Sequence, residues 1–164
     1  MSNNNIIFEN IIKKFSEKLP KFSDGRIDYS NSDKAPVLVC FKYQNDILLL
    51  KRSDKVRTYQ GLWNTVAGYL DEPKPVIQKA YEEVSEEISV GKKNILKTKI
   101  GDSFKFYDKD IKKIWIIFPV LIELKFKPAI KLDWEHTDYK WIKIREIKKY
   151  NVIPHLDKTL AKVL

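Results

Sequence analysis

The apolar positions at the start of the chain follow a helical repeat. Apolar side chains recur at intervals of one to four residues from Ile6 to Phe15, and Pro20 ends the pattern. This spacing predicts an amphipathic N-terminal helix whose apolar stripe packs on the rest of the protein. The stretch from residue 22 to residue 34 is rich in Ser, Asp and Asn and contains Gly25, so we expect a loop that leads into the folded body.

From Pro36 onward, short runs of β-branched, aliphatic and aromatic residues between turn residues predict β-strands. Two of these runs, residues 37–43 and 47–51, are separated by Gln44-Asn45-Asp46, and we expect them to form a hairpin or neighbouring antiparallel strands. The other expected strands are residues 63–67, 95–107, 114–124 and 139–144.

A helix is expected between the early and the late strands. Apolar residues trace one stripe at helical spacing from Val76 to about Val90, and Gly91 marks the end. More helical structure is expected near Glu146 and from His155 to Val163. Strands on both sides of a central helix predict an α/β/α sandwich built on a mixed β-sheet.

The length and composition are those of one globular domain. The chain has 164 residues, of which 43% are apolar, which is enough for one core. We expect residues 1–34 to form the N-terminal helix and lead-in loop, and residues 35–164 to form the main domain. Lysine and arginine exceed the acidic residues by 31 − 22 = 9, which favours partners that carry phosphate, although a generally basic surface explains the excess equally well.

The chain carries no signal for secretion or membrane insertion. Cys40 is the only cysteine, so it cannot form an internal disulfide, and its apolar neighbours predict a small buried side chain in a reducing compartment. Residues 1–9 lack the pattern of a signal peptide. The longest apolar run, Ile114 to Ile122, is interrupted by Pro119 and is shorter than a membrane helix. We therefore expect a soluble, cytoplasmic protein with no membrane partner.

Four carboxylates crowd into six residues of the central helix: Glu82, Glu83, Glu86 and Glu87. If the apolar stripe faces inward, Glu83 and Glu87 lie together along one edge of it and Glu86 lies just beyond. Like charges at this spacing repel, and a bound cation relieves that repulsion. Carboxylate and carbonyl oxygens are the ligands of Mg²⁺ and Mn²⁺, which favours a metal site over the alternative of a solvated acidic face.

Residues 68–90 resemble the signature box of the Nudix hydrolases, G-x5-E-x7-R-E-U-x-E-E-x-G-U, where U is aliphatic. Six positions match without a gap: Gly68, Glu83, Val84, Glu86, Glu87 and Val90. Three positions depart, because Lys74 replaces the loop glutamate, Glu82 replaces the arginine and Ser89 replaces the second glycine. The resemblance covers roughly residues 36–150.

The resemblance implies a hydrolase that uses Mg²⁺ or Mn²⁺ to cleave the diphosphate linkage of ADP-ribose, a nucleotide sugar or an NTP-like substrate. The implied metal ligands are the side chains of Glu83, Glu86 and Glu87 and the backbone carbonyl of Ala67. Either Glu86 or Glu135, which precedes a late strand, is the expected general base. A homodimer is also compatible with the family.

Basic residues near the box are candidates for two roles. Arg52 and Arg57 are expected to bind substrate phosphates through forked hydrogen bonds, unless they are ordinary surface arginines. The family's arginine helps to hold the glutamates, and Glu82 cannot do so. Lys79, four residues before Glu83, or Lys74 is expected to supply the compensating charge. Ser89 is tolerated if the left-handed residue that ends the helix moves to Gly91.

Two other functions remain open. An isopentenyl-diphosphate isomerase has a cysteine beside the box glycine, where this chain has Ala67. A catalytically impaired Nudix-fold module would instead bind a nucleotide or RNA through its positive surface, although no nucleic-acid motif is visible. Four aromatic residues are candidates for stacking on a base, but packing within strands explains them at least as well: Phe104, Phe106, Tyr107 and Trp115.

Overall fold

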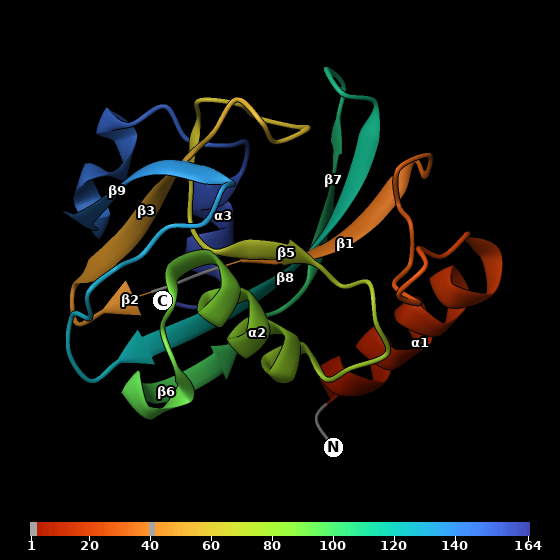
Figure 1. Ribbon diagram of the computed structural model, residues 1–164, viewed down its shortest axis with the longest axis horizontal. Coiled ribbons are helices and arrows are strands. Elements are labelled where there is room, and N and C mark those ends of the chain that lie inside the picture. The colour runs from red at the N-terminus through yellow and green to blue at the C-terminus, as the bar shows by residue number, and fades with distance from the viewer. Residues whose placement is uncertain (1–2, 40–41) are drawn as a thin grey trace.

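Strand β8 (Lys113–Leu124) is the longest strand and organises the sheet of the computed structural model, which describes residues 3–39 and 42–164 (Figure 1). The other strands are β1 (Lys34–Val39), β2 (Lys42–Tyr43), β3 (Asp46–Arg52), β4 (Trp63–Asn64), β5 (Ala67–Tyr69), β6 (Ile95–Ile100), β7 (Phe104–Asp108) and β9 (His136–Lys143). The helices are α1 (Asn3–Lys18), α2 (Val76–Ile88) and α3 (Leu156–Ala161), with short 3₁₀ helices η1 (Lys92–Asn94) and η2 (Ile144–Lys149). Cys40 lies outside the described residues.

The sheet is mixed and strongly curled. Strand β8 pairs in parallel with β1 and β2, and antiparallel with β6 and β7. Strand β1 also pairs with β5, while β3 pairs with β2, β4 and β9, all antiparallel. The chain therefore joins its early and late strands in one sheet, which places the ends of β3 and β5 and the start of β9 near helix α2.

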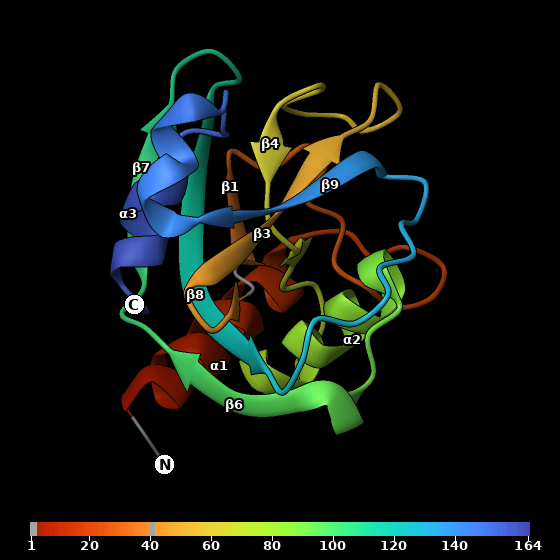
Figure 2. The same cartoon turned by 90° about the vertical axis from the view of Figure 1, so that its left-hand side faces the viewer.

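The alternating side chains of β3 show how helices cover both faces of the sheet. Leu48 and Leu50 belong to a core cluster that includes residues of α1 and α2, whereas Ile47 and Leu49 pack with Leu156 and other residues of α3. Figure 2 shows α3 on one side of the sheet and α1 and α2 on the other. This arrangement confirms the predicted α/β/α sandwich with a mixed β-sheet.

The N-terminal helix and the lead-in loop contribute to the first of these clusters. Ile12 of α1 and Ile27 and Tyr29 of the loop are almost fully buried in it. The Tyr29 hydroxyl donates a hydrogen bond to the Leu70 carbonyl oxygen at 2.7 Å. The predicted amphipathic helix is therefore present, and the loop after it packs against the residue that follows strand β5.

The hairpin prediction is confirmed, but two other predicted strands are divided. Strands β2 and β3 pair across a turn in which Gln44 has φ of 47°. Residues 63–67 form β4 and the start of β5 instead of one strand. Residues 95–107 form β6 and β7, with a break at Gly101, where a Cβ atom would come within 2.5 Å of the Lys162 carbonyl oxygen. The close approach of the α3 end therefore divides this segment.

Helix α2 ends differently from the prediction. The left-handed residue at its C-terminus is Ser89, with φ of 59° and ψ of 36°, and its N–H donates to the Ser85 carbonyl oxygen. Gly91 is extended, with φ of −86°, so the expectation that it would take this role is wrong. Ser89 accepts a backbone conformation that favours glycine because the turn must lead directly to buried Val90.

Across residues 3–39 and 42–164, no helix combines the length and the apolar character needed to cross a bilayer.

Replacing Ser89 with glycine should stabilise the protein. Glycine adopts the left-handed conformation without the steric cost that a side chain brings, so we expect Ser89→Gly to raise the free energy of unfolding by about 1 kcal/mol. Urea denaturation measures this change. The matched control is Ser85→Gly in the interior of α2, which should lower stability by about 0.5 kcal/mol. A loss of stability in both variants would contradict the prediction.

Candidate active site

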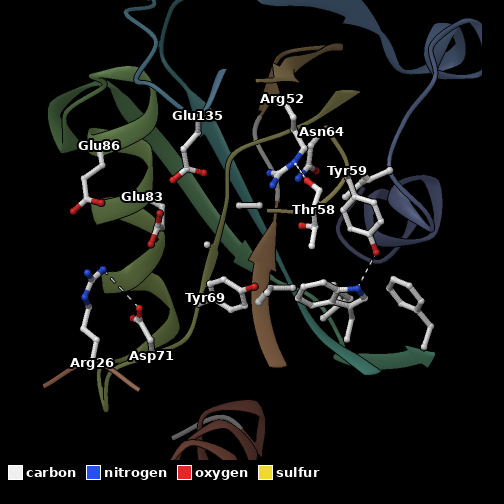
Figure 3. A pocket seen from close by; sticks show the side chains of 17 residues that line it. Arg26, Arg52, Thr58, Tyr59, Asn64, Tyr69, Asp71, Glu83, Glu86 and Glu135 are labelled. Atoms are coloured by element: carbon white, nitrogen blue, oxygen red, sulfur yellow. Dashed lines mark hydrogen bonds and ion pairs between the residues drawn. The ribbon is translucent and has the colours of Figure 1, made fainter. Parts of the chain in front are cut away.

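One cavity gathers residues from distant parts of the chain at the face of α2 (Figure 3). Five of the residues predicted to bind metal or substrate or to act as the base line it: Arg52, Ala67, Glu83, Glu86 and Glu135. The other lining residues are Arg26, Val37, Thr58, Tyr59, Asn64, Gly68, Tyr69, Asp71, Phe106, Trp115, Ile117 and Ile153. The cavity therefore combines carboxylates, arginines and an aromatic wall.

Gly68 allows the carboxylate of Glu83 to lie directly against the backbone of β5. A Cβ atom at Gly68 would come within 2.2 Å of the Glu83 Cδ atom and 2.4 Å of its Oε1 atom, which is closer than any real contact. The position needs glycine for this close approach and not for an unusual φ angle. The opening glycine of the box therefore makes room for one of the candidate metal ligands.

Glu87 lies behind the cavity wall and has an unpaired oxygen. Its side chain is buried, and Oε2 has no hydrogen-bond partner. The closest ionisable nitrogen is Nε2 of His136, at 3.7 Å, and the other ring nitrogen of His136 lies 3.0 Å from Asp133 Oδ1. Burial, with repulsion from Glu83, raises the pKa of Glu87 well above its usual value. A buried carboxylate in this state needs a proton or a cation.

Glu83 is in a similar electrostatic position at the cavity surface. Burial raises its pKa to about 7, the positive charge of Lys79 partly opposes this rise, and Glu86 adds to it. The unpaired oxygen of Glu87 and the Glu83 carboxylate, which occupies the space beside Gly68, are oxygen ligands that suit a hard divalent cation. Among the described residues, no three Asp, Glu, His or Cys side chains already converge on one ion position. Exposed Glu86 must therefore rotate to join such a site.

Two lysines balance the acidic cluster. Buried Lys79 lies 3.4 Å from Glu83 Oε1 and 3.0 Å from Asp71 Oδ1, as measured from its Nζ atom. Lys74 lies 3.2 Å from both carboxylate oxygens of Glu82. The Nudix box has an acid at position 74 and a base at position 82, so this chain pairs the same two positions with the charges exchanged. Glu82 is thus paired with a cation and does not add uncompensated repulsion.

Glu135 lies in the cavity between the glutamates of α2 and Arg52 (Figure 3). The Nε atom of Arg52 donates to the Thr58 carbonyl oxygen at 2.9 Å, which fixes one edge of the guanidinium. The backbone of Glu135 is held by the Ser53 N–H at 2.7 Å. Burial raises the pKa of the Glu135 carboxyl, and Asp133 adds to that rise. A fixed guanidinium therefore lies in the same cavity as a carboxylate of increased basicity.

The far end of the cavity is aromatic. Trp115 donates its Nε1 hydrogen to the Tyr59 hydroxyl at 2.8 Å, and Tyr59 in turn is hydrogen-bonded to Asp108. The rings of Tyr69 and Trp115 lie 6.2 Å apart. Two of the aromatic residues noted in the sequence, Phe106 and Trp115, line the cavity, whereas Phe104 and Tyr107 do not. This wall offers flat apolar surfaces held by fixed hydrogen bonds.

Two predicted residues do not line the cavity, and several residues that do were not predicted. Arg57 is exposed and donates to the Ser30 hydroxyl at 2.8 Å, and Glu87 is buried behind the wall. Asn64 lies in the strand expected at residues 63–67, and Tyr69 follows Gly68 of the box, so both positions carried a usable signal. Arg26 lies in a polar loop with no motif around it, and nothing in the sequence marked it.

Comparison with known proteins identifies relatives of this arrangement. The family described as NUDIX domain matches residues 33–163. A MutT protein from Methanosarcina mazei Go1 has a TM-score of 0.65 and 19% identity, over 78% of this chain and 91% of that chain. A C. elegans Ap4A hydrolase has a TM-score of 0.60 and 22% identity, over 79% of this chain and 93% of that chain.

A third similar structure is the NUDIX domain of Shewanella oneidensis NrtR complexed with ADP ribose, with a TM-score of 0.63 and 13% identity, over 78% of this chain and 86% of that chain. At these identities the likeness concerns the fold. A comparison of the sequence with curated proteins found no match.

The raised pKa values of Glu83 and Glu87 predict that the metal-free protein loses stability as the pH rises. The pKa of Glu83 is about 7 in the folded state against an ordinary 4.5, so between these values the folded protein binds more protons than the unfolded chain. The free energy of unfolding should fall across this window, by at most about 3 kcal/mol for Glu83. Urea denaturation in EDTA from pH 5 to pH 8 measures it.

The same denaturation series tests the link to metal. Mg²⁺ competes with protons for the carboxylates, so the stabilisation that it adds should increase from pH 5 to pH 8. In Glu83→Gln both the decline in EDTA and the effect of Mg²⁺ should be smaller. A stability that rises steadily over this pH range in EDTA would contradict the assignment.

Proposed function

The chain belongs to the Nudix family, and from this premise we propose that it is a metal-dependent hydrolase that cleaves the diphosphate linkage of a nucleotide-type substrate. The observation that carries the proposal is the cavity in which Glu83, Glu86 and Glu135 face Arg52. Carboxylates such as Glu83 and Glu135, whose pKa values are raised, and an immobilised arginine are the components that phosphoanhydride hydrolysis requires.

The proposed ligands of the metal are Glu83, Glu86 and Glu87, together with the backbone carbonyl of Ala67. Oxygen ligands of this kind suit Mg²⁺ or Mn²⁺. When bound, the ion would supply positive charge to the phosphates and acidify an attacking water. The buried, unpaired oxygen of Glu87 and the contact between Gly68 and Glu83 support this assignment.

Glu135 is the proposed general base. It lines the cavity between the glutamates of α2 and Arg52, its pKa is raised by burial, and its backbone is fixed by Ser53, so it is positioned to take a proton from water. As the water oxygen bonds to one phosphorus, the bond between that phosphorus and the bridging oxygen breaks, and the second phosphate leaves as an anion. Arg52 would donate hydrogen bonds to the phosphate oxygens as this charge develops.

The aromatic end of the cavity suits a nucleoside. Tyr69 and Trp115 present ring surfaces next to the phosphate region, and a base that stacks there would place its diphosphate near α2. The similar NUDIX domain of NrtR was solved with ADP ribose, and another similar structure is an Ap4A hydrolase. These facts support a nucleoside-diphosphate core as the common part of the substrate.

A catalytically impaired binding module is the alternative, and its basis was the loss of the box arginine. The pair between Lys74 and Glu82 weakens this argument, because the charges have exchanged positions and still attract each other, although Lys74 also pairs with Glu72 at 2.9 Å. Lys79 supplies a further buried cation beside Glu83. The electrostatic support of the glutamates is therefore retained by other residues, which favours the hydrolase.

Hydrolysis of a panel of nucleoside-diphosphate compounds tests the proposal. With Mg²⁺ or Mn²⁺, the wild-type protein should release phosphate-containing products from at least one of ADP-ribose, nucleotide sugars, dinucleoside polyphosphates and nucleoside triphosphates. Glu83→Gln should reduce kcat on the order of 100-fold or more, because it removes a ligand charge. Glu17→Gln, on the exposed side of α1, is the matched control and should leave kcat unchanged. No turnover of any compound would instead favour the binding module.

A charge-exchange experiment tests the role of the pair between Lys74 and Glu82. Lys74→Glu and Glu82→Arg, made singly, each put like charges side by side and should lower the affinity for Mn²⁺ and kcat several-fold. The double variant restores the order of the Nudix box and should recover most of both values. Additive losses in the double variant would contradict a shared role.

A further inference from the structure

Arg26 reaches the cavity from outside the part of the chain that matches the family. The NUDIX match begins at residue 33, whereas Arg26 belongs to the lead-in loop between α1 and β1. Its side chain nevertheless lines the cavity together with Glu83 and Glu86 (Figure 3). The chain therefore adds a cation to this cavity from a segment specific to its N-terminal region.

The loop that carries Arg26 has a defined shape. Residues 21 and 27 form a bridge, and the Phe22 N–H donates to the Arg26 carbonyl oxygen at 2.8 Å. Gly25 takes a φ of +87°, which the tight turn requires. The Ile27 N–H donates to the Asp71 carbonyl oxygen at 2.8 Å, which attaches the loop to the segment between β5 and α2.

One edge of the Arg26 guanidinium is occupied and the other is open. Asp24 accepts hydrogen bonds from the backbone N–H of Arg26 at 3.0 Å and from its Nε atom at 2.7 Å. The Nη1 atom is 3.8 Å from Asp71, whose carboxylate is already paired with Lys79 at 3.0 Å. The Arg26 side chain is 46% exposed. Asp24 thus orients the guanidinium, and the Nη groups retain hydrogen-bonding capacity toward the cavity.

The position of Arg26 along the cavity gives it a distinct role. In Figure 3 it lies beside Glu83 and Glu86, on the opposite side of the cavity from Tyr59 and Arg52. A nucleotide whose base lies at the aromatic end would bring its first phosphates toward Arg52 and the carboxylates. Arg26 lies beyond the region that a diphosphate would fill. It is therefore placed to bind one more phosphate at the far end of a longer polyphosphate.

We propose that Arg26 binds a phosphate that extends past the scissile linkage, so that the protein prefers nucleoside triphosphates or longer polyphosphates over nucleoside diphosphates. This inference rests on the proposed function for the orientation of the substrate. The planar guanidinium, held at its Nε edge, offers the phosphate two parallel N–H donors. The excess of nine positive charges in the chain favours the approach of such highly charged substrates.

The test compares two probes that differ by one phosphate and resist hydrolysis at the α–β linkage: α,β-methylene-ATP and α,β-methylene-ADP. Their affinities for the full chain are measured by calorimetry at a fixed Mg²⁺ concentration. The wild type should bind the triphosphate analogue at least about tenfold more tightly. Arg26→Gln should reduce this preference to within about twofold. The matched control is Arg145→Gln, because Arg145 is exposed and does not line the cavity, and this variant should keep the full preference.

Two further measurements separate the outcomes. Thermal denaturation shows whether the Arg26→Gln variant is folded. The Arg26→Lys variant keeps the positive charge but lacks the paired N–H donors of the guanidinium, so it should keep only part of the preference for the triphosphate analogue. A full preference in both variants, or no preference in the wild type, overturns the role of Arg26. Because binding does not require turnover, an Arg26-dependent preference in a protein that hydrolyses nothing would contradict the proposed function and still support this inference.

Discussion

The burial of two carboxylates between α2 and β5 is the constraint on which the rest of the site depends. Glu83 lies against the backbone at Gly68, and Glu87 is enclosed with an oxygen that has no hydrogen-bond partner. Removing ionised groups from water is costly unless a partner charge accompanies them. The charged side chains around α2 therefore reduce the cost of burying these two acids.

This requirement explains the arrangement of basic residues around α2. Lys79 is buried with its nitrogen close to three acids, and burial, which by itself lowers its pKa, is outweighed by Glu83 and the neighbouring carboxylates. Lys74 and Glu82 form an ion pair at the two positions where the Nudix box has a glutamate and an arginine, so opposite charges meet here in the exchanged order. A comparison of single motif letters therefore overstates how far this chain departs from its relatives.

The sequence predicted the layered fold and the acidic helix well because both have strong local periodicity. Helix α2 begins at Val76 as expected, and Arg52 and Glu135 lie in the same cavity as Glu83. The errors arose where tertiary contacts decide the outcome. The break at Gly101 depends on the end of α3, and the left-handed Ser89 depends on the turn to buried Val90. Arg26 was invisible because a single arginine in a polar loop carries no pattern.

The packing of the lead-in loop shows that the unit of homology and the unit of folding differ in this protein. The family match starts at residue 33, yet Ile12, Ile27 and Tyr29 fill the same core cluster as α2. A chain cut at the homology boundary would remove these three side chains from the cluster, and the apolar surface left exposed to water would favour aggregation. The N-terminal segment is therefore a structural part of the domain, and a fragment designed to fold must include it together with the region that matches the family.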